Sequence, residues 1–271
     1  LDFYLKVNSP TLEQIYKSND IYKETFDEAW SSGVMVDREI MQMIVEKGFW
    51  TPTDIQDEKQ LPKDIEDAKV DMFKALFDVQ KRERHRRLLR GMEKKLKNIL
   101  TKKTHYDSMG CGGTATYAKW NWLIEECTTY DDGTPYDWQH IGVSTVLYKY
   151  QQHALSETDI REIARNDPWR TIWASGKNTG GVFDCSAAEL SEEQKAIGVW
   201  SRMYDGIQEH PECPTDEVID DDDLLDGWLI MQRRERETQA KTKRFDSTTG
   251  NEKLSNADEV FVVARSEQDV A

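Results

Sequence analysis

Apolar residues recur at steps of three and four along the first fifty positions, which is the spacing of one face of an α-helix. The pattern predicts a short apolar opening followed by two helices. Ser9 is expected to cap the first helix and Pro10 to fill its first position. Asp37 is expected to cap the second helix and Gly48 to close it. The residues expected to form the buried face of the first helix are Leu12, Ile15, Tyr16, Ile21, Tyr22, Phe26 and Trp30.

A polar linker is expected between Pro52 and Pro62, and residues 63–103 are predicted to form one long helix. Its apolar positions alternate steps of three and four, stop across a polar gap from Lys81 to Arg87, and then resume. This spacing favours a coiled-coil or helical-hairpin seam. Along the gap the helix is expected to face solvent or a partner. The apolar positions are Ile65, Ala68, Met72, Leu76, Val79, Leu89, Met92, Leu96 and Ile99.

The second half of the chain carries further helix signals. Residues 114–127 have apolar residues at helical spacing. Ser156 with Asp159, and Ser191 with Gln194, have the spacing of capping boxes, in which each side chain bonds to the other residue's backbone N–H. The sequence therefore predicts a helix start at each of these serines.

Two segments break the helical pattern. Residues 106–113 hold three glycines within four positions and are expected to form a turn. A phosphate-binding loop is not expected there, because no Gly-Lys-Ser/Thr sequence follows an apolar strand. Val260–Val263 is the strongest strand candidate near the C-terminus, and Leu1–Val7 is a hypothetical partner for it.

These patterns predict a mainly α protein with little β structure. Residues 1–104 are expected to form a helical N-terminal region that includes the long basic helix 63–103. Residues 105–240 are expected to form a Trp-rich α-helical second domain. Residues 241–271 are polar and are expected to form a C-terminal segment with a short strand.

The composition is that of a folded protein with much polar surface. Of 271 residues, 38% are hydrophobic and 32% are charged, and the nine Trp and ten Tyr argue against wholesale disorder. The four cysteines are far apart, so a reducing compartment is favoured over a disulfide scaffold. No apolar run approaches the roughly 20 residues of a membrane span. The first residues also lack the pattern of a signal peptide.

The formal net charge is −15, but it is unevenly distributed. Residues 81–103 contain eleven Lys or Arg against two Glu. The favoured interpretation is a solvated helix face that pairs with acidic regions of the same chain. The functional interpretation is a docking stripe for an acidic partner or for nucleic acid. Nucleic acid is less favoured, because no aromatic residues interleave with the basic ones. The candidate partner-binding residues are Lys81, Arg82, Arg84, Arg86, Arg87 and Arg90.

Six tryptophans, at positions 120, 122, 169, 173, 200 and 228, lie in the second half beside polar or charged neighbours. Most are expected to be core residues, which is the usual place of a large apolar ring. Because Trp is enriched at the centres of protein interfaces, Trp169, Trp173 and Trp228 are candidate partner-binding residues.

The sequence carries little sign of catalytic or metal chemistry. His210, Cys213 and Cys185 are zinc-ligand types, but they do not form the paired clusters that a structural zinc site needs. The acidic run 220–223 lacks the spacing of a calcium-binding loop, and Ser175 lacks the context of a hydrolase nucleophile. No catalytic residue, metal or cofactor is expected, and the protein is expected not to be an enzyme. A zinc-dependent enzyme or zinc-stapled domain is a third alternative.

Five segments carry further signatures: Lys47-Gly48-Phe49-Trp50-Thr51, Arg86-Arg87-Leu88-Leu89-Arg90, Tyr117-Ala118-Lys119-Trp120-Asn121-Trp122, Asp167-Pro168-Trp169-Arg170, and Leu224-Leu225-Asp226-Gly227-Trp228-Leu229-Ile230. Together they resemble the tail and baseplate assembly proteins of tailed bacteriophages, which include tail assembly chaperone-like products. The resemblance implies a non-enzymatic protein that binds tape-measure, hub or tube components. It supplies no catalytic residues.

The functional hypothesis is therefore a bacteriophage tail or baseplate assembly protein, or a virion structural protein, that contacts other tail or baseplate proteins. The expected location is the host cytoplasm or the virion, with no membrane association, and self-association is left open. The alternative is a nucleic-acid-associated or polymerase-binding regulator that uses the basic helix 81–103. Strongly salt-dependent binding to DNA or RNA would favour that alternative.

Overall fold

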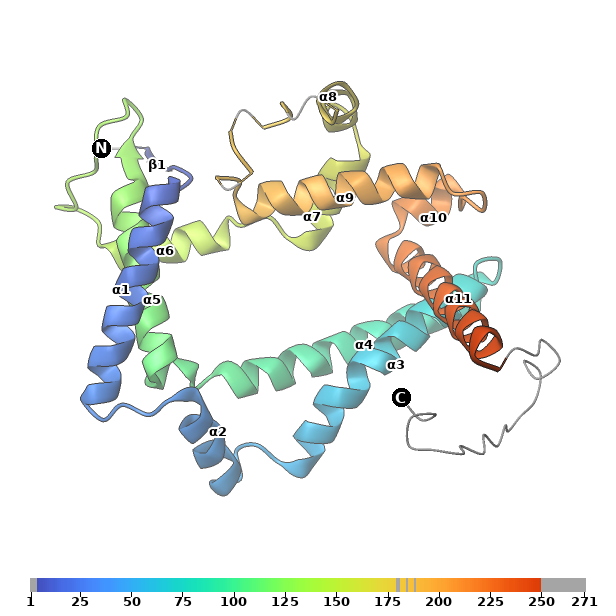
Figure 1. The fold of residues 1–271 in the computed structure, drawn as a ribbon, viewed down its shortest axis with the longest axis horizontal. Helices are drawn as coiled ribbons and strands as arrows, with labels where there is room; N and C mark the ends of the chain where they lie inside the picture. Colours follow the sequence, from blue (N-terminus) through green and yellow to red (C-terminus); the bar gives the residue numbers. More distant parts are fainter. Residues whose placement is uncertain (1–3, 179–180, 184, 188, 250–271) are drawn as a thin grey trace. The chain divides into compact units, whose positions relative to one another are not determined.

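The computed structural model describes residues 4–178, 181–183, 185–187 and 189–249. These residues form eleven α-helices, one 3-10 helix and a two-stranded sheet, so the prediction of a mainly α protein with little β structure is confirmed (Figure 1). The elements in chain order are β1 (Leu5–Val7), α1 (Leu12–Ser31), α2 (Asp37–Glu46), α3 (Pro52–Lys74), α4 (Val79–Thr104), η1 (Asp107–Met109), α5 (Cys111–Cys127), β2 (Thr128–Tyr130), α6 (Val143–Gln152), α7 (Glu157–Arg165), α8 (Trp169–Gly176), α9 (Glu192–Gln208), α10 (Asp216–Asp220) and α11 (Asp222–Thr249).

Contacts divide the chain into two compact units. The first contains Leu1–Asp64 and Arg90–Asp216, and the second contains Ile65–Leu89 and Glu217–Ala271. The predicted divisions, at residues 104 and 240, follow chain order and do not coincide with these units. The second unit combines two segments that are far apart in sequence, which composition along the chain cannot indicate. Within the described residues, none of the helices has the length and apolar character of a membrane span.

The helix α1 begins two residues later than the sequence suggested. Thr11, not Ser9, is the N-cap, and its side chain and that of Gln14 form a full capping box. α1 lies side by side with α5 in the first unit (Figure 1). The predicted buried face is only partly buried, because Tyr16 and Trp30 each leave 64% of their surface exposed.

The sheet pairs segments that the sequence did not connect. β1 is antiparallel to β2, with Leu5 opposite Tyr130 and Val7 opposite Thr128. The sequence suggested Val260–Val263 as the partner of Leu1–Val7, and that pairing stays a prediction. The segment 260–263 itself lies outside the described residues. The observed pairing follows from the packing of α1 along α5, because β1 precedes α1 and β2 follows α5.

The glycine-rich segment 106–113 starts a helix and is not only a turn. α5 begins at Cys111, directly after η1. A Cβ atom on Gly113 would lie 2.0 Å from the carbonyl oxygen of Asp107, so only glycine lets these two elements approach this closely. The segment does require glycine, as the sequence indicated. The reason is the close approach of η1 and α5, not the turn that was predicted.

The segment 63–103 forms parts of two helices and not one. α3 ends at Lys74 and α4 begins at Val79. The break has a local cause: Asp78 Oδ1 accepts the backbone N–H of Lys81 at 3.0 Å, which caps the new helix. Phe77, at the turn, is 97% exposed. Of the two predicted arrangements, the helical hairpin is the one that agrees with this break.

The expected polar linker between Pro52 and Pro62 is helical. Asp54 Oδ2 accepts hydrogen bonds from the N–H and the hydroxyl of Thr51, and the Thr51 hydroxyl in turn accepts the N–H of Asp54. This capping box starts α3 at Pro52, a position where proline costs no hydrogen bond. Pro62 lies inside the helix.

The two predicted capping boxes of the second half are confirmed. Ser156 with Asp159 starts α7, and Ser191 with Gln194 starts α9. α7 and α9 pack against each other in the first unit. A hydrophobic core of the same unit contains residues from α2, α3, α4 and the turn before α3: Ile40, Ile44, Trp50, Leu61 and Ile99.

In the second unit, α11 approaches the backbone of α3 closely. Lys69 on α3 pairs with Asp226 on α11 at 2.6 Å, and both side chains are largely buried. A Cβ atom on Gly227 would lie 2.3 Å from the Lys69 carbonyl oxygen and 2.9 Å from Phe73 Cβ. Gly227 therefore sets the distance between these helices.

We expect Gly227→Ala to lower the free energy of unfolding by about 1–3 kcal/mol, because the added methyl group forces α3 and α11 apart. Gly91→Ala, in the exposed middle of α4 where an added Cβ meets nothing within 4 Å, is the matched control. It should raise stability by up to about 1 kcal/mol through helix propensity. Urea unfolding followed by circular dichroism measures both. Equal effects of the two substitutions would contradict the close approach.

Candidate functional site

The basic run is carried by α4, and part of it is neutralised within the second unit. Arg82 pairs with Glu217 at 2.9 Å and also donates to the carbonyl oxygen of Leu76. Arg86 pairs with Glu83 on its own helix and with Asp221 at the start of α11. Arg82 and Arg86 therefore form ion pairs with carboxylates of the same chain, as we expected for a solvated basic helix.

The C-terminal half of α4 is partly neutralised within the first unit. Lys95 pairs with Asp57 at 2.7 Å, Lys102 with Asp54 at 2.5 Å and Lys103 with Glu58 at 2.5 Å. All three carboxylates come from α3. Hydrogen bonds from Lys102 and from Thr51 lower the pKa of Asp54 to about 2. These pairs connect the two helices of the hairpin.

Four cations on α4 remain without a hydrogen bond or ion pair among the described residues: Arg84, Arg87, Lys94 and Lys97. We name them the free cations. All four are exposed, and each pair, 84 with 87 and 94 with 97, is separated by three residues. Residues three apart on a helix lie on the same side of it. The buried residues Leu89 and Ile99 fall on a different side of α4.

The other predicted residues of the basic helix have local partners. Lys81 pairs with Asp78 at 3.2 Å, and Arg90 pairs with Glu93 at 2.7 Å. Both pairs are exposed and lie three residues apart, so they contribute little stability and break readily. Of the six predicted residues, only Arg84 and Arg87 are free cations. Lys94 and Lys97 belonged to the same basic run but were not singled out by the sequence.

Trp169 and Trp173 lie on one face of α8, as their spacing predicts, and their rings stack with centroids 6.4 Å apart. Their indole N–H groups are engaged with α9: Trp169 donates to Ser201 Oγ at 2.7 Å, and Trp173 donates to Asp205 Oδ2 at 2.8 Å. Trp173 is buried. Both rings therefore serve the packing of α8 on α9.

Asp205 is the centre of this contact, and no pattern in the sequence indicated it. Its carboxylate also accepts hydrogen bonds from Arg170 at 2.6 Å and from Lys177 at 3.0 Å. Burial alone would raise the pKa of Asp205, but the donors Trp173, Arg170 and Lys177 outweigh it and lower the pKa to about 2.

Trp228, the third predicted aromatic anchor, lies in the core of the second unit. It is 4% exposed, and its neighbours in sequence Leu224 and Leu225 are buried as well. Its ring offers almost no surface to a partner. The exposed tryptophans of the first unit are Trp30 and Trp120, and neither was among the predicted partner-binding residues.

The zinc alternative finds no support in the geometry. Among the described residues, no group of three His, Cys, Asp or Glu side chains could hold a metal ion. Cys185 and Cys213 are exposed free thiols. His210 Nδ1 accepts the backbone N–H of Glu212 at 3.1 Å.

Comparisons of this chain with protein families, with curated proteins and with solved structures found no match. The candidate site therefore depends on the geometry of α4 and on the resemblance of the five short segments.

We expect Asp205→Asn to lower the free energy of unfolding by about 2 kcal/mol at pH 7, because the shift from 3.8 to about 2 measures what the carboxylate gains on folding. This contribution is complete above about pH 5 and is lost as the pH falls toward 2, where the folded protein also binds the proton. Urea unfolding at several pH values should show the difference between variant and wild type shrink over that window.

Asp131→Asn is the control, since Asp131 is exposed and forms no ion pair among the described residues. It should leave stability unchanged at every pH. A constant difference between Asp205→Asn and wild type from pH 7 to pH 2 would contradict the assigned role of the carboxylate.

Proposed function

We propose that this protein is a non-enzymatic assembly protein of a tailed bacteriophage and that it binds an acidic surface of another tail or baseplate protein through the free cations of α4. The bacteriophage setting is supported by the resemblance of the five segments. The docking surface is supported by one observation: Arg84, Arg87, Lys94 and Lys97 stay exposed and unpaired in a chain of net charge −15.

The unpaired state of these four residues is informative because the chain has carboxylates in excess. Fifty-one Asp and Glu face thirty-six Lys and Arg, and carboxylates from α3, α10 and α11 do pair with other cations of α4. Arg84 and Arg87 in the second unit, and Lys94 and Lys97 in the first, are exposed on the side of α4 away from the buried Leu89 and Ile99. Leu88, which is 54% exposed and follows Arg84 by one turn, adds an apolar contact to this side.

Such a surface favours fast and specific association more than high affinity. Each exposed ion pair contributes about 0.2–1 kcal/mol, since water screens the charges and the long side chains lose entropy. Charge complementarity raises the association rate and repels partners of like charge. The partner is expected to be acidic, and the complex is expected to weaken as salt increases.

Nucleic acid fits the same charges less well. Binding to a phosphate backbone needs many cations and a favourable total charge, and this chain is strongly acidic. No Phe, Tyr or Trp lies between Arg84 and Lys97 to stack on a base. The regulator hypothesis is therefore the second candidate, and the experiment below distinguishes it.

We expect the fourfold reversal Arg84→Glu, Arg87→Glu, Lys94→Glu and Lys97→Glu to reduce capture of the partner about tenfold or more, because four attractive contacts become repulsive. The measurement is affinity capture of the tagged full chain from its native cells, with quantitative mass spectrometry of the bound proteins. Recovery of tail, hub or tape-measure proteins with the wild type, and their loss with the variant, is the expected result.

The control reverses four exposed lysines that lie elsewhere: Lys17, Lys47, Lys59 and Lys63. It changes the net charge by the same amount, so it separates a local surface from a general charge effect, and it should retain the partner. Equal capture by both variants would contradict the role of α4. Recovery of nucleic acid or polymerase subunits with the wild type would replace the proposal with the regulator hypothesis.

A further inference from the structure

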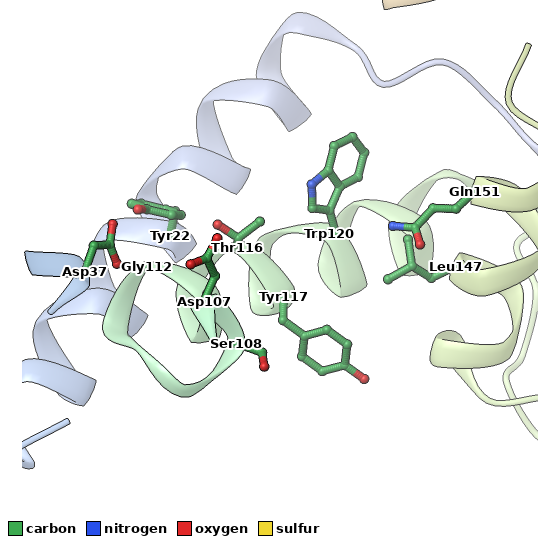
Figure 2. Close-up of a pocket in the computed structure, with 11 residues that line it drawn as sticks. Tyr22, Asp37, Asp107, Ser108, Gly112, Thr116, Tyr117, Trp120, Leu147 and Gln151 are labelled. Atoms are coloured by element: carbon green, nitrogen blue, oxygen red, sulfur yellow. The ribbon is translucent and has the colours of Figure 1, made fainter. Parts of the chain in front are cut away.

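The first unit contains a cleft of about 520 Å³ along α5, which also receives side chains from α1, α2, η1 and α6 (Figure 2). Two kinds of side chain dominate it. Tyr22, Tyr117 and Trp120 supply aromatic rings, and Asp37 and Asp107 supply carboxylates. Neither the basic helix nor the Trp169–Trp173 pair takes part in it.

The glycines at the start of α5 build the acidic end of this cleft. Gly113 allows η1 to touch α5, and this contact places Asp107 and Ser108 at the wall of the cleft. A Cβ atom on Gly112 would lie 2.9 Å from Asp37 Oδ1, so a larger residue would displace that carboxylate. Figure 2 shows both carboxylates and the Tyr22 ring of α1 at the same end of α5.

Two further aromatic side chains, Tyr117 and Trp120, line the cleft along α5. Thr116 and Trp120 are four residues apart and point to the same side of α5 in Figure 2. The Trp120 side chain belongs to a residue that is 41% exposed. Tyr117 is held by a 2.7 Å hydrogen bond between its hydroxyl and that of Ser144. An aromatic surface of this kind, open to solvent and next to unpaired carboxylates, is complementary to an organic cation.

No Lys, Arg or His is among the residues that line this cleft. The side chains of Asp37 and Asp107 form no hydrogen bond or ion pair in the described part of the chain. The nearest basic residue along this part of α5, Lys119, donates to Asn19 on α1 at 2.7 Å and does not line the cleft. The cleft is therefore electronegative, although the chain holds thirty-six Lys and Arg.

We propose that this cleft binds an arginine side chain presented by an exposed segment of a protein partner. Guanidinium is planar, so it can stack on an indole or phenol ring while its N–H groups donate to a carboxylate. Both features line this cleft, where Tyr22 lies at the same end as the two carboxylates and Trp120 lies further along α5. An ammonium group satisfies the carboxylates but cannot stack in the same way, so lysine should bind more weakly.

The probe is the peptide acetyl-Gly-Arg-Gly-amide, added to the full-length protein and followed by the indole N–H signals of the tryptophans in two-dimensional NMR. Its citrulline counterpart has the same shape without the charge. The arginine peptide should shift the Trp120 signal in a saturable way, with binding about tenfold stronger than that of the citrulline peptide. The lysine peptide should fall between them.

The double variant Asp37→Asn and Asp107→Asn should weaken binding of the arginine peptide about tenfold. Trp120→Ala should weaken it severalfold, measured by calorimetry. Asp27→Asn and Trp30→Ala, at exposed positions on α1 outside the cleft, are the matched controls and should bind as the wild type does. Circular dichroism of each variant verifies the fold.

Equal binding of arginine and citrulline peptides, or full binding by the double variant, would overturn the proposal. So would the absence of any shift at peptide concentrations of tens of millimolar. The test is independent of the proposed docking surface, because the variant with reversed free cations on α4 should bind the arginine peptide as the wild type does. Loss of partner capture and loss of peptide binding therefore report on two different sites.

Discussion

Repulsion between like charges on α4 is the constraint on which the rest of this structure depends. A helix with eleven cations in residues 81–103 is destabilised by its own field unless carboxylates lie nearby. Within the second unit they come from α10 and α11, and within the first unit they come from α3. Several pairs are partly shielded from water, with the Arg82 side chain 17% and the Asp57 side chain 22% exposed. These pairs strengthen the packing of α4, and they determine which cations are left over.

The two proposed binding surfaces have opposite character. The free cations of α4 are suited to an acidic partner, whereas the cleft on α5 is suited to a cationic one. A protein that carries both can contact chemically different partners without competition between them. That property agrees with a role in assembly, where one component must recognise several others in a defined order.

The tryptophans illustrate why a residue type alone does not identify a binding surface. Trp169 and Trp173 have the spacing and the polar neighbours of interface anchors, yet their N–H groups are directed to Ser201 and Asp205 on α9. A buried indole needs an acceptor, and here the acceptor is internal. Trp120, at a similar spacing on α5, has no such acceptor among the described residues and stays 41% exposed.

The sequence by itself determined the features that depend on a few neighbouring residues. The capping boxes at Ser156 and Ser191 and the mainly helical character follow from local hydrogen bonds and from helical periodicity, and the structure confirms them. The break at Asp78 was also local, but the apolar periodicity on either side concealed it. The capping box at Thr51 was local as well, but Pro52 and Pro62 indicated a linker in its place.

Only the tertiary structure decided what depends on residues far apart in the chain. The pairing of β1 with β2 joins segments more than one hundred residues apart, and Asp205 meets its three donors across two helices. The same is true of α4: its charge was evident in the sequence, but which cations remain free depends on where α3, α10 and α11 place their carboxylates. The charge of a side chain follows from its residue type, whereas its freedom to bind a partner depends on which carboxylates the fold places beside it.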